Sequence, residues 1–135
     1  MALDPSAPIE FINAALAVRM RAHAPYSKFL VGASVKADDG TVYVGCNVEN
    51  ASYGLTICAE RSAVAQMVAA GRRHAVELAI TTMGGHAPCG ACRQVLAEFA
   101  SHLVIWLVDV DESGKPVSAE RVTLNELFPR RFDLG

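Results

Sequence analysis

The sequence predicts one α/β domain spanning residues 1–135, in which helices cover both faces of a mixed, roughly five-stranded sheet. Segments of β-type apolar residues alternate with segments of helical periodicity, an arrangement typical of a three-layer α/β/α sandwich. No internal repeat, linker or low-complexity segment divides the chain. With 135 residues, the chain is long enough to bury roughly two-thirds of its unfolded surface around one hydrophobic core.

The first third of the chain predicts a helix followed by a β-hairpin. A helix is expected over residues 8–22, and Pro25 ends it. Strands are expected over 30–37 and 41–46, joined by the tight turn Asp-Asp-Gly at 38–40. The apolar face of the helix is expected to consist of Ile9, Ile12, Leu16 and Met20.

The remainder of the chain predicts helices and strands in alternation. Thr56 is expected to cap the next helix, and Gly71 to end it. Pro88 suits the first turn of the helix after that, where its missing N–H is no loss. The elements expected, in order, are a loop over 47–55, a helix over 56–71, a strand over 76–82, a helix over 88–100, a strand over 103–110 and a short helix or turn over 122–127.

Charge and hydropathy exclude several classes of partner. The formal net charge is -2 and no run of Lys or Arg exceeds two residues, so a tract that binds nucleic acid or anionic lipid is absent. The apolar run 103–108 is only strand-sized, and the N-terminus lacks the pattern of a signal peptide. We therefore expect a cytoplasmic protein that does not insert into membranes. A hydrophobic content of 52% favours a buried subunit interface.

Two cysteines separated by two residues occur in the stretch HAPCGACRQV, residues 86–95. Such a pair is a redox dithiol, a disulfide or half of a metal site. In a cytosolic chain, metal binding or catalysis is favoured over a disulfide. Cys89 and Cys92 would lie three residues apart in the first turn of a helix, so both thiols would share one face of it.

A second stretch, TICAERSAV, supplies the other half of the site. It places Cys58 and Glu60 in the first turn of the helix expected over 56–71, and helix N-termini stabilise thiolates. Together with Cys89 and Cys92, Cys58 would give a zinc ion three sulfur ligands and leave a fourth position open beside Glu60. Cys-x-Glu followed by Pro-Cys-x-x-Cys is the pattern of zinc-dependent nucleoside and nucleobase deaminases.

With these motifs, the sequence resembles the small, homotetrameric cytidine deaminases of the cytidine and deoxycytidylate deaminase superfamily. The resemblance implies hydrolytic deamination of cytidine and 2′-deoxycytidine to uridine and 2′-deoxyuridine with release of ammonia, in pyrimidine salvage. It also implies one Zn²⁺ per subunit and a homotetramer with shared active sites. Leu30, where proline is frequent, and the unusual loop 82–86 depart from the pattern. The blocks that carry the resemblance are PYSKFLVGASV (25–35), GCNVENASYGLTICAERSAV (45–64), PCGACRQVLAEF (88–99) and LNELFPRRF (124–132).

The resemblance further implies a role for individual residues. Glu60 would transfer protons, and Arg61 would donate hydrogen bonds to the ligand sulfurs and offset their negative charge. An aromatic face suits a pyrimidine ring, while a carboxylate and an amide suit sugar hydroxyls. The substrate contacts implied are Phe29 against the base, Asn47 and Glu49 at the ribose 3′-hydroxyl, the main chain of Ala59 at the polar edge of the base, and Tyr53 and Phe132 in a neighbouring subunit's pocket.

Other interpretations of the same residues remain open. Cys46 as a fourth ligand would give a structural zinc module, although a packed free thiol at a strand end is preferred. His86 is a candidate to replace one sulfur, but three cysteines suffice. Cys89 and Cys92 alone would serve a thiol–disulfide oxidoreductase. Among deaminases, an enzyme acting on a modified or antibiotic cytosine nucleoside, of the blasticidin type, is the alternative.

Overall fold

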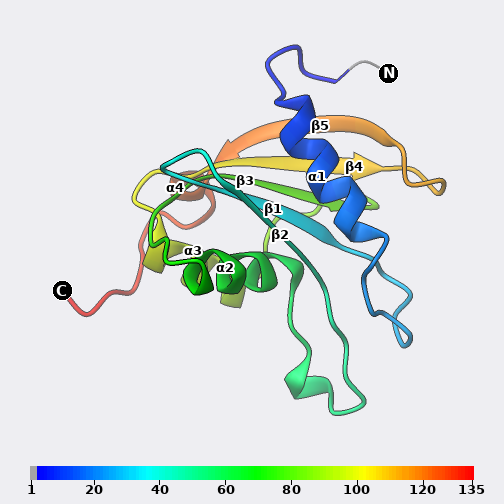
Figure 1. Ribbon diagram of the computed structural model, residues 1–135, viewed down its shortest axis with the longest axis horizontal. Coiled ribbons are helices and arrows are strands. Elements are labelled where there is room, and N and C mark those ends of the chain that lie inside the picture. Colours follow the sequence, from blue (N-terminus) through cyan, green and yellow to red (C-terminus); the bar gives the residue numbers. More distant parts are fainter. Residues whose placement is uncertain (1–2) are drawn as a thin grey trace.

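A mixed sheet with strand order β2-β1-β3-β4-β5 organises the structure, a computed structural model that describes residues 3–135 (Figure 1). Strands β3 and β4 are parallel, and every other neighbouring pair is antiparallel. The strands are β1 (Gly32–Ala37), β2 (Val42–Cys46), β3 (Ala75–Thr82), β4 (Val104–Val110) and β5 (Pro116–Thr123). The helices are α1 (Ile9–Arg19), α2 (Ala59–Ala69), α3 (Gly90–Phe99) and α4 (Leu124–Leu127), with one 3₁₀ turn at Tyr53–Leu55.

The sheet is covered on both faces, which confirms the predicted sandwich. Figure 1 shows α1 crossing one face while α2 and α3 lie on the other. Because successive side chains of a strand point to opposite faces, β4 serves both layers. Ile105 and Leu107 pack in the cluster that contains α2 and α3, whereas Trp106 and Val108 pack against α1. None of the described helices is long and apolar enough to cross a membrane.

The buried face of α1 differs from the prediction. Ile9 and Met20 are exposed, while Phe11 and Ala15 are buried beside the correctly predicted Ile12. Met20 lies outside the packed helix because α1 already ends at Arg19. The other buried positions of α1 are Ile12 and Arg19, and Leu16 is partly buried against the same cluster.

Helix α1 lies so close to β1 that the strand has room only for a glycine at position 32. A side-chain carbon added to Gly32 would overlap the carbonyl oxygen of Ala15. The hydroxyl of Thr81 donates at 3.2 Å to the carbonyl oxygens of Ala15 and Gly32, and so satisfies its own buried polarity. The prediction considered only large apolar residues, and it therefore missed that α1 packs on the sheet through Ala15.

The edge strand β5 is not predicted by the sequence pattern, although the overall size of the sheet is. Residues 116–121 (PVSAER) mix polar with apolar side chains and are at least partly exposed, and Val122 is the one buried residue of the strand. An edge strand tolerates proline at its first position and polar residues along its length. The closing segment expected over 122–127 splits into the end of β5 and the short helix α4.

Candidate active site

One edge of the sheet collects the residues that the motifs single out. β1 begins at Gly32, which pairs with Cys46 at the end of β2 and with Thr81 near the end of β3. Helices α2 and α3 both begin at this edge, which agrees with the expectation that their N-termini converge (Figure 1). The antiparallel pairing of β1 with its two neighbours is what brings these chain segments together.

Cysteines occupy the N-cap positions of both helices. Cys58 precedes α2 and Cys89 precedes α3, and their carbonyl oxygens accept the first helical hydrogen bonds at 3.1 and 2.9 Å. The prediction that Thr56 caps α2 is therefore wrong, and Pro88 lies just before the cap of α3 rather than in its first turn. Neither cysteine side chain caps its own helix, so both thiols are free to point toward each other.

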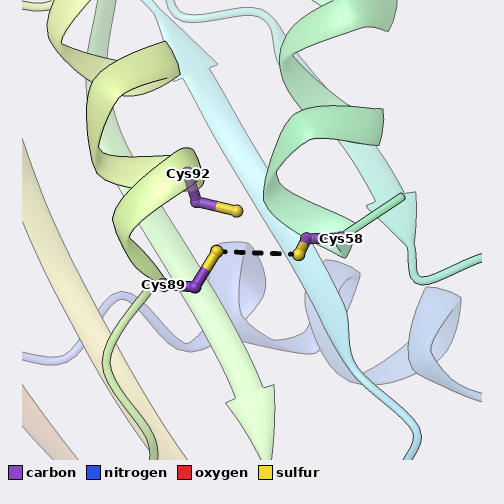
Figure 2. A group of neighbouring side chains, drawn as sticks. All are labelled: Cys58, Cys89 and Cys92. Carbon is purple, nitrogen blue, oxygen red and sulfur yellow. Dashed lines mark hydrogen bonds between the residues drawn. The ribbon is translucent and has the colours of Figure 1, made fainter. Parts of the chain in front are cut away.

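The sulfur atoms of Cys58, Cys89 and Cys92 lie within 4.8 Å of one another (Figure 2). The Cys58 and Cys89 sulfurs are 3.8 Å apart, the separation expected of two ligands held at about 2.3 Å on a tetrahedral zinc ion. Within residues 3–135, no other group of metal-binding side chains is this close. The predicted donor set therefore fits zinc.

Two alternative ligands do not join the sulfur cluster. Cys46 is a partly buried free thiol at the end of β2, as the preferred interpretation states, and it lies outside the group. His86 also lies outside the group and packs instead on Phe29. A four-cysteine structural module is therefore not formed.

Hydrogen bonding makes the three thiols of the cluster unequal. The pKa of Cys58 is lowered to about 5, first by a hydrogen bond from the Cys92 thiol and then by those from Arg61 and Cys89. The same bond to Cys58, together with burial, raises the pKa of Cys92. The guanidinium of Arg61 donates to the Cys58 sulfur at 3.5 Å. Its Nε is buried and has no hydrogen-bond partner within the described residues.

Glu60 lies in the first turn of α2 and is only 5% exposed. Burial raises the pKa of its carboxyl group, and the negative charge of the neighbouring Cys58 thiolate raises it further. A carboxyl group shifted toward neutral pH exchanges protons readily, which is the property required of a general acid and base.

Glu60, Cys58 and Cys89 line a cavity of about 230 Å³. Phe29 and Asn47 form part of its wall, so the structure brings the predicted base-binding and sugar-binding residues to the same space. The remaining lining residues are Val31, Thr56, Ile57, Ala59, Ile80, Thr82, His86 and Ala87.

Asn47 fixes the backbone around Phe29. Its side-chain oxygen accepts from the N–H of Val31 at 2.9 Å, and its amide donates to the carbonyl of Phe29 at 2.8 Å. An amide side chain has a second N–H and a second lone pair, so Asn47 retains one donor and one acceptor for a ligand.

Glu49 lies in a hollow next to the main cavity, and Thr56 borders both. Its carboxylate accepts hydrogen bonds from the backbone N–H groups of Tyr26 and Ser27 and from the Ser27 hydroxyl. These bonds, that from the Ser27 hydroxyl first, lower the pKa of Glu49 and keep it ionised. The motifs did not identify Ser27 and Tyr26 as partners of Glu49, because the contact spans more than twenty residues of sequence.

Two predicted substrate residues do not reach the cavity of their own chain. Tyr53 is 77% exposed and packs edge-on against Tyr26, with ring centroids 6.1 Å apart. Phe132 is 67% exposed on the tail after α4 and borders a separate hollow beside α3. The guanidinium of Arg93 donates to the carbonyl oxygens of Pro88 and Leu127, with bonds of 2.8 Å each.

Comparison with known proteins agrees with this geometry. The cytidine and deoxycytidylate deaminase zinc-binding region matches residues 6–108 of the chain. The cytidine deaminase of Sporosarcina psychrophila is 44% identical over 117 residues, which cover 84% of this chain and 82% of that protein. One from Mycobacterium tuberculosis is 44% identical over 118 residues, covering 84% of this chain and 80% of its own length.

Solved structures agree at the level of the whole fold. The crystal structure of cytidine deaminase from Burkholderia pseudomallei superimposes with a TM-score of 0.85 and 41% identity, and the match covers 93% of this chain and 99% of that one. The chain therefore belongs to the cytidine and deoxycytidylate deaminase family, as its motifs predict.

Proposed function

We propose that the protein hydrolyses cytidine and 2′-deoxycytidine to uridine and 2′-deoxyuridine, with release of ammonia. The observation that carries this proposal is the convergence of three thiols beside a buried carboxyl group, at a cavity that Cys58, Cys89 and Glu60 line. A thiol–disulfide oxidoreductase has no need of Glu60, and a four-cysteine module would require Cys46 in the cluster. Neither alternative explains why three cysteines lie beside Glu60.

Cys58, Cys89 and Cys92 would hold one zinc ion per chain, since their sulfurs have the spacing of three ligands of a tetrahedral site. When bound, zinc supplies a Lewis acid that makes water a nucleophile near neutral pH. Three thiolates exceed the charge of a divalent ion by one negative unit, which opposes this effect. Arg61 offsets that charge by donating to the Cys58 sulfur.

Glu60 is the proton carrier of the proposed reaction. Its carboxylate takes a proton from the attacking water and delivers it to N3 of the pyrimidine as the C4–O bond forms. A second proton passes through Glu60 to the exocyclic nitrogen, the C4–N bond breaks, and ammonia leaves. Water therefore supplies the oxygen of the uridine carbonyl and the two protons that reach N3 and the leaving nitrogen. The raised pKa of Glu60 lets it accept and release a proton in the same cycle.

Residues around the cavity orient the nucleoside. Phe29 offers a ring face to the pyrimidine, and the remaining amide groups of Asn47 meet the ribose 3′-hydroxyl together with the ionised Glu49. Ala59 is the first residue of α2, so its N–H has no partner within the helix and is available to the oxygen of the base.

A homotetramer with shared active sites is part of the same proposal. Tyr53 and Phe132 are largely exposed in a single chain, and burial in a neighbouring subunit would remove that apolar surface from water. The other large exposed apolar residues that support an interface include Tyr26, Val48, Leu55 and Ile57. A cytoplasmic location and a role in pyrimidine salvage stay predictions.

An ultraviolet absorbance assay with cytidine, combined with quantification of zinc, tests the function. We expect the purified protein to convert cytidine to uridine and to carry one zinc ion per chain. Absence of cytidine turnover by zinc-loaded protein would contradict the proposal, as would a zinc content unaffected by replacement of Cys58.

A further inference from the structure

The loop between β3 and α3 presents a second aromatic side chain to the cavity. Phe29 and His86 are the aromatic residues of its lining. Their ring centroids are 5.9 Å apart and the ring planes are inclined by 59°. At this separation and tilt no base fits between the two rings, so they form adjoining walls. A base that lies on Phe29 therefore meets the imidazole with its edge.

Backbone hydrogen bonds fix the loop that carries the imidazole. The backbone N–H of His86 donates to the hydroxyl of Thr82 at 2.9 Å, and that of Gly84 donates to the carboxylate of Asp109 at 2.7 Å. Gly84 has a φ of +101°, and a side-chain carbon added there would lie 2.6 Å from Nε2 of His86. Glycine is therefore required both by the backbone conformation and by the space that the imidazole fills.

The proposed function decides which edge of the base faces His86. The reacting carbon, C4, must lie at the sulfur cluster, and its two ring neighbours are N3 and C5. Glu60 serves N3 from α2. C5 then points away from α2, toward the loop that carries His86 and ends at Cys89.

We propose that His86 is a specificity-determining residue that limits the size of the substituent at C5 of the pyrimidine. The wall is tied to β3 and β4 through Thr82 and Asp109, so it yields little to a larger base. A methyl group that must displace the imidazole from its position against Phe29 and Gly84 is rejected on the order of tenfold or more. This inference rests on the proposed function and adds to it the range of bases that the site accepts.

Selectivity between cytidine and 5-methylcytidine tests the inference. The ratio of kcat/KM for the two nucleosides is measured for the wild type and for two substitutions of one residue. His86→Ala removes the wall, and the ratio should shift toward 5-methylcytidine by about tenfold. His86→Phe keeps an aromatic wall without ring nitrogens, and the ratio should continue to favour cytidine. His102→Ala, at an exposed histidine outside the cavity, should leave both rates unchanged.

Product binding gives a second readout that needs no turnover. Calorimetric dissociation constants for uridine and 5-methyluridine should converge in His86→Ala and remain apart in the wild type. An unchanged ratio in His86→Ala, or a wild type that already treats the two nucleosides alike, overturns the role of His86. A wild type inactive on cytidine itself would instead contradict the proposed function, so the two failures are distinguishable.

Discussion

The sulfur cluster and the C-terminal tail are two parts of one proposed active site, and they differ in how much of their geometry a single chain provides. The cluster is built from two helix N-termini fixed at the same sheet edge, and its three thiols face one another (Figure 2). The tail presents the Phe132 ring to solvent, and its contacts with the domain are made by Gln94, which donates to the Phe132 carbonyl, and by Arg131, which donates to the carbonyl of Ala100. The proposed metal site therefore lies within one chain, whereas the proposed closure over the base would require a neighbouring subunit.

Loss of a cluster ligand should have the largest effect, because two thiols do not hold zinc as three do. Cys58→Ala should abolish both bound zinc and cytidine turnover. Cys46→Ala is the matched control, since its thiol lies at the end of a neighbouring strand outside the cluster, and it should keep both. Zinc per chain is measured by atomic absorption. Equal zinc contents in the two variants would remove Cys58 from the ligand set.

Replacement of Glu60 should separate chemistry from metal binding. Glu60→Gln should keep one zinc per chain but lower kcat by about 10³-fold, roughly 4 kcal/mol of transition-state stabilisation. Because burial raises the pKa of Glu60, its ionised form destabilises the fold above that pKa. The neutral amide should therefore not lower the melting temperature of the metal-free protein. Turnover near that of the wild type would refute the proton-transfer role.

Sugar recognition by Glu49 should show as lost discrimination. In Glu49→Ala, the preference for cytidine over 3′-deoxycytidine in kcat/KM should fall by about tenfold or more, because the carboxylate that the analogue would leave without its hydroxyl partner is gone. Glu49→Gln keeps an oxygen for the N–H groups of Tyr26 and Ser27, and so controls for collapse of that loop. A wild type that processes 3′-deoxycytidine as well as cytidine would show that the contact does not exist.

The tail should have the smallest effect, confined to substrate affinity and assembly. Phe132→Ala should raise KM about tenfold, the cost of leaving one aromatic contact unmade, while zinc content stays the same. Leu134→Ala, at a tail residue that is 96% exposed, is the control and should behave as the wild type. Light scattering should find a tetramer for the wild type. A fully active monomer would contradict the shared site.

The sulfur cluster was also the part of the site that the sequence predicted best. Cys58, Glu60, Cys89 and Cys92 were predictable because short motifs place them at helix N-termini, where local geometry fixes the position of each side chain. The caps themselves were misassigned, since Thr56 has the better capping side chain and yet Cys58 occupies the position. Tertiary packing sets the residue at which α2 begins, and local capping propensity does not include that effect.

Elements without a strong local pattern were the ones that prediction missed. The edge strand β5 has polar residues on both faces, so its alternation is weak. The helix α1 packs through Ala15 against Gly32, and a close approach of two backbones leaves no mark in apolar periodicity. The bonds from Ser27 and Tyr26 to Glu49 and the packing of His86 on Phe29 join distant segments, which only the folded chain brings together.

The most direct test of the account is a zinc titration of chelator-treated protein, followed by cytidine turnover. The convergence of three thiols beside Glu60 predicts that activity is absent without metal, rises in proportion to added zinc and saturates at one equivalent per chain. Full activity in protein free of metal would contradict the assignment of the cluster as a catalytic zinc site.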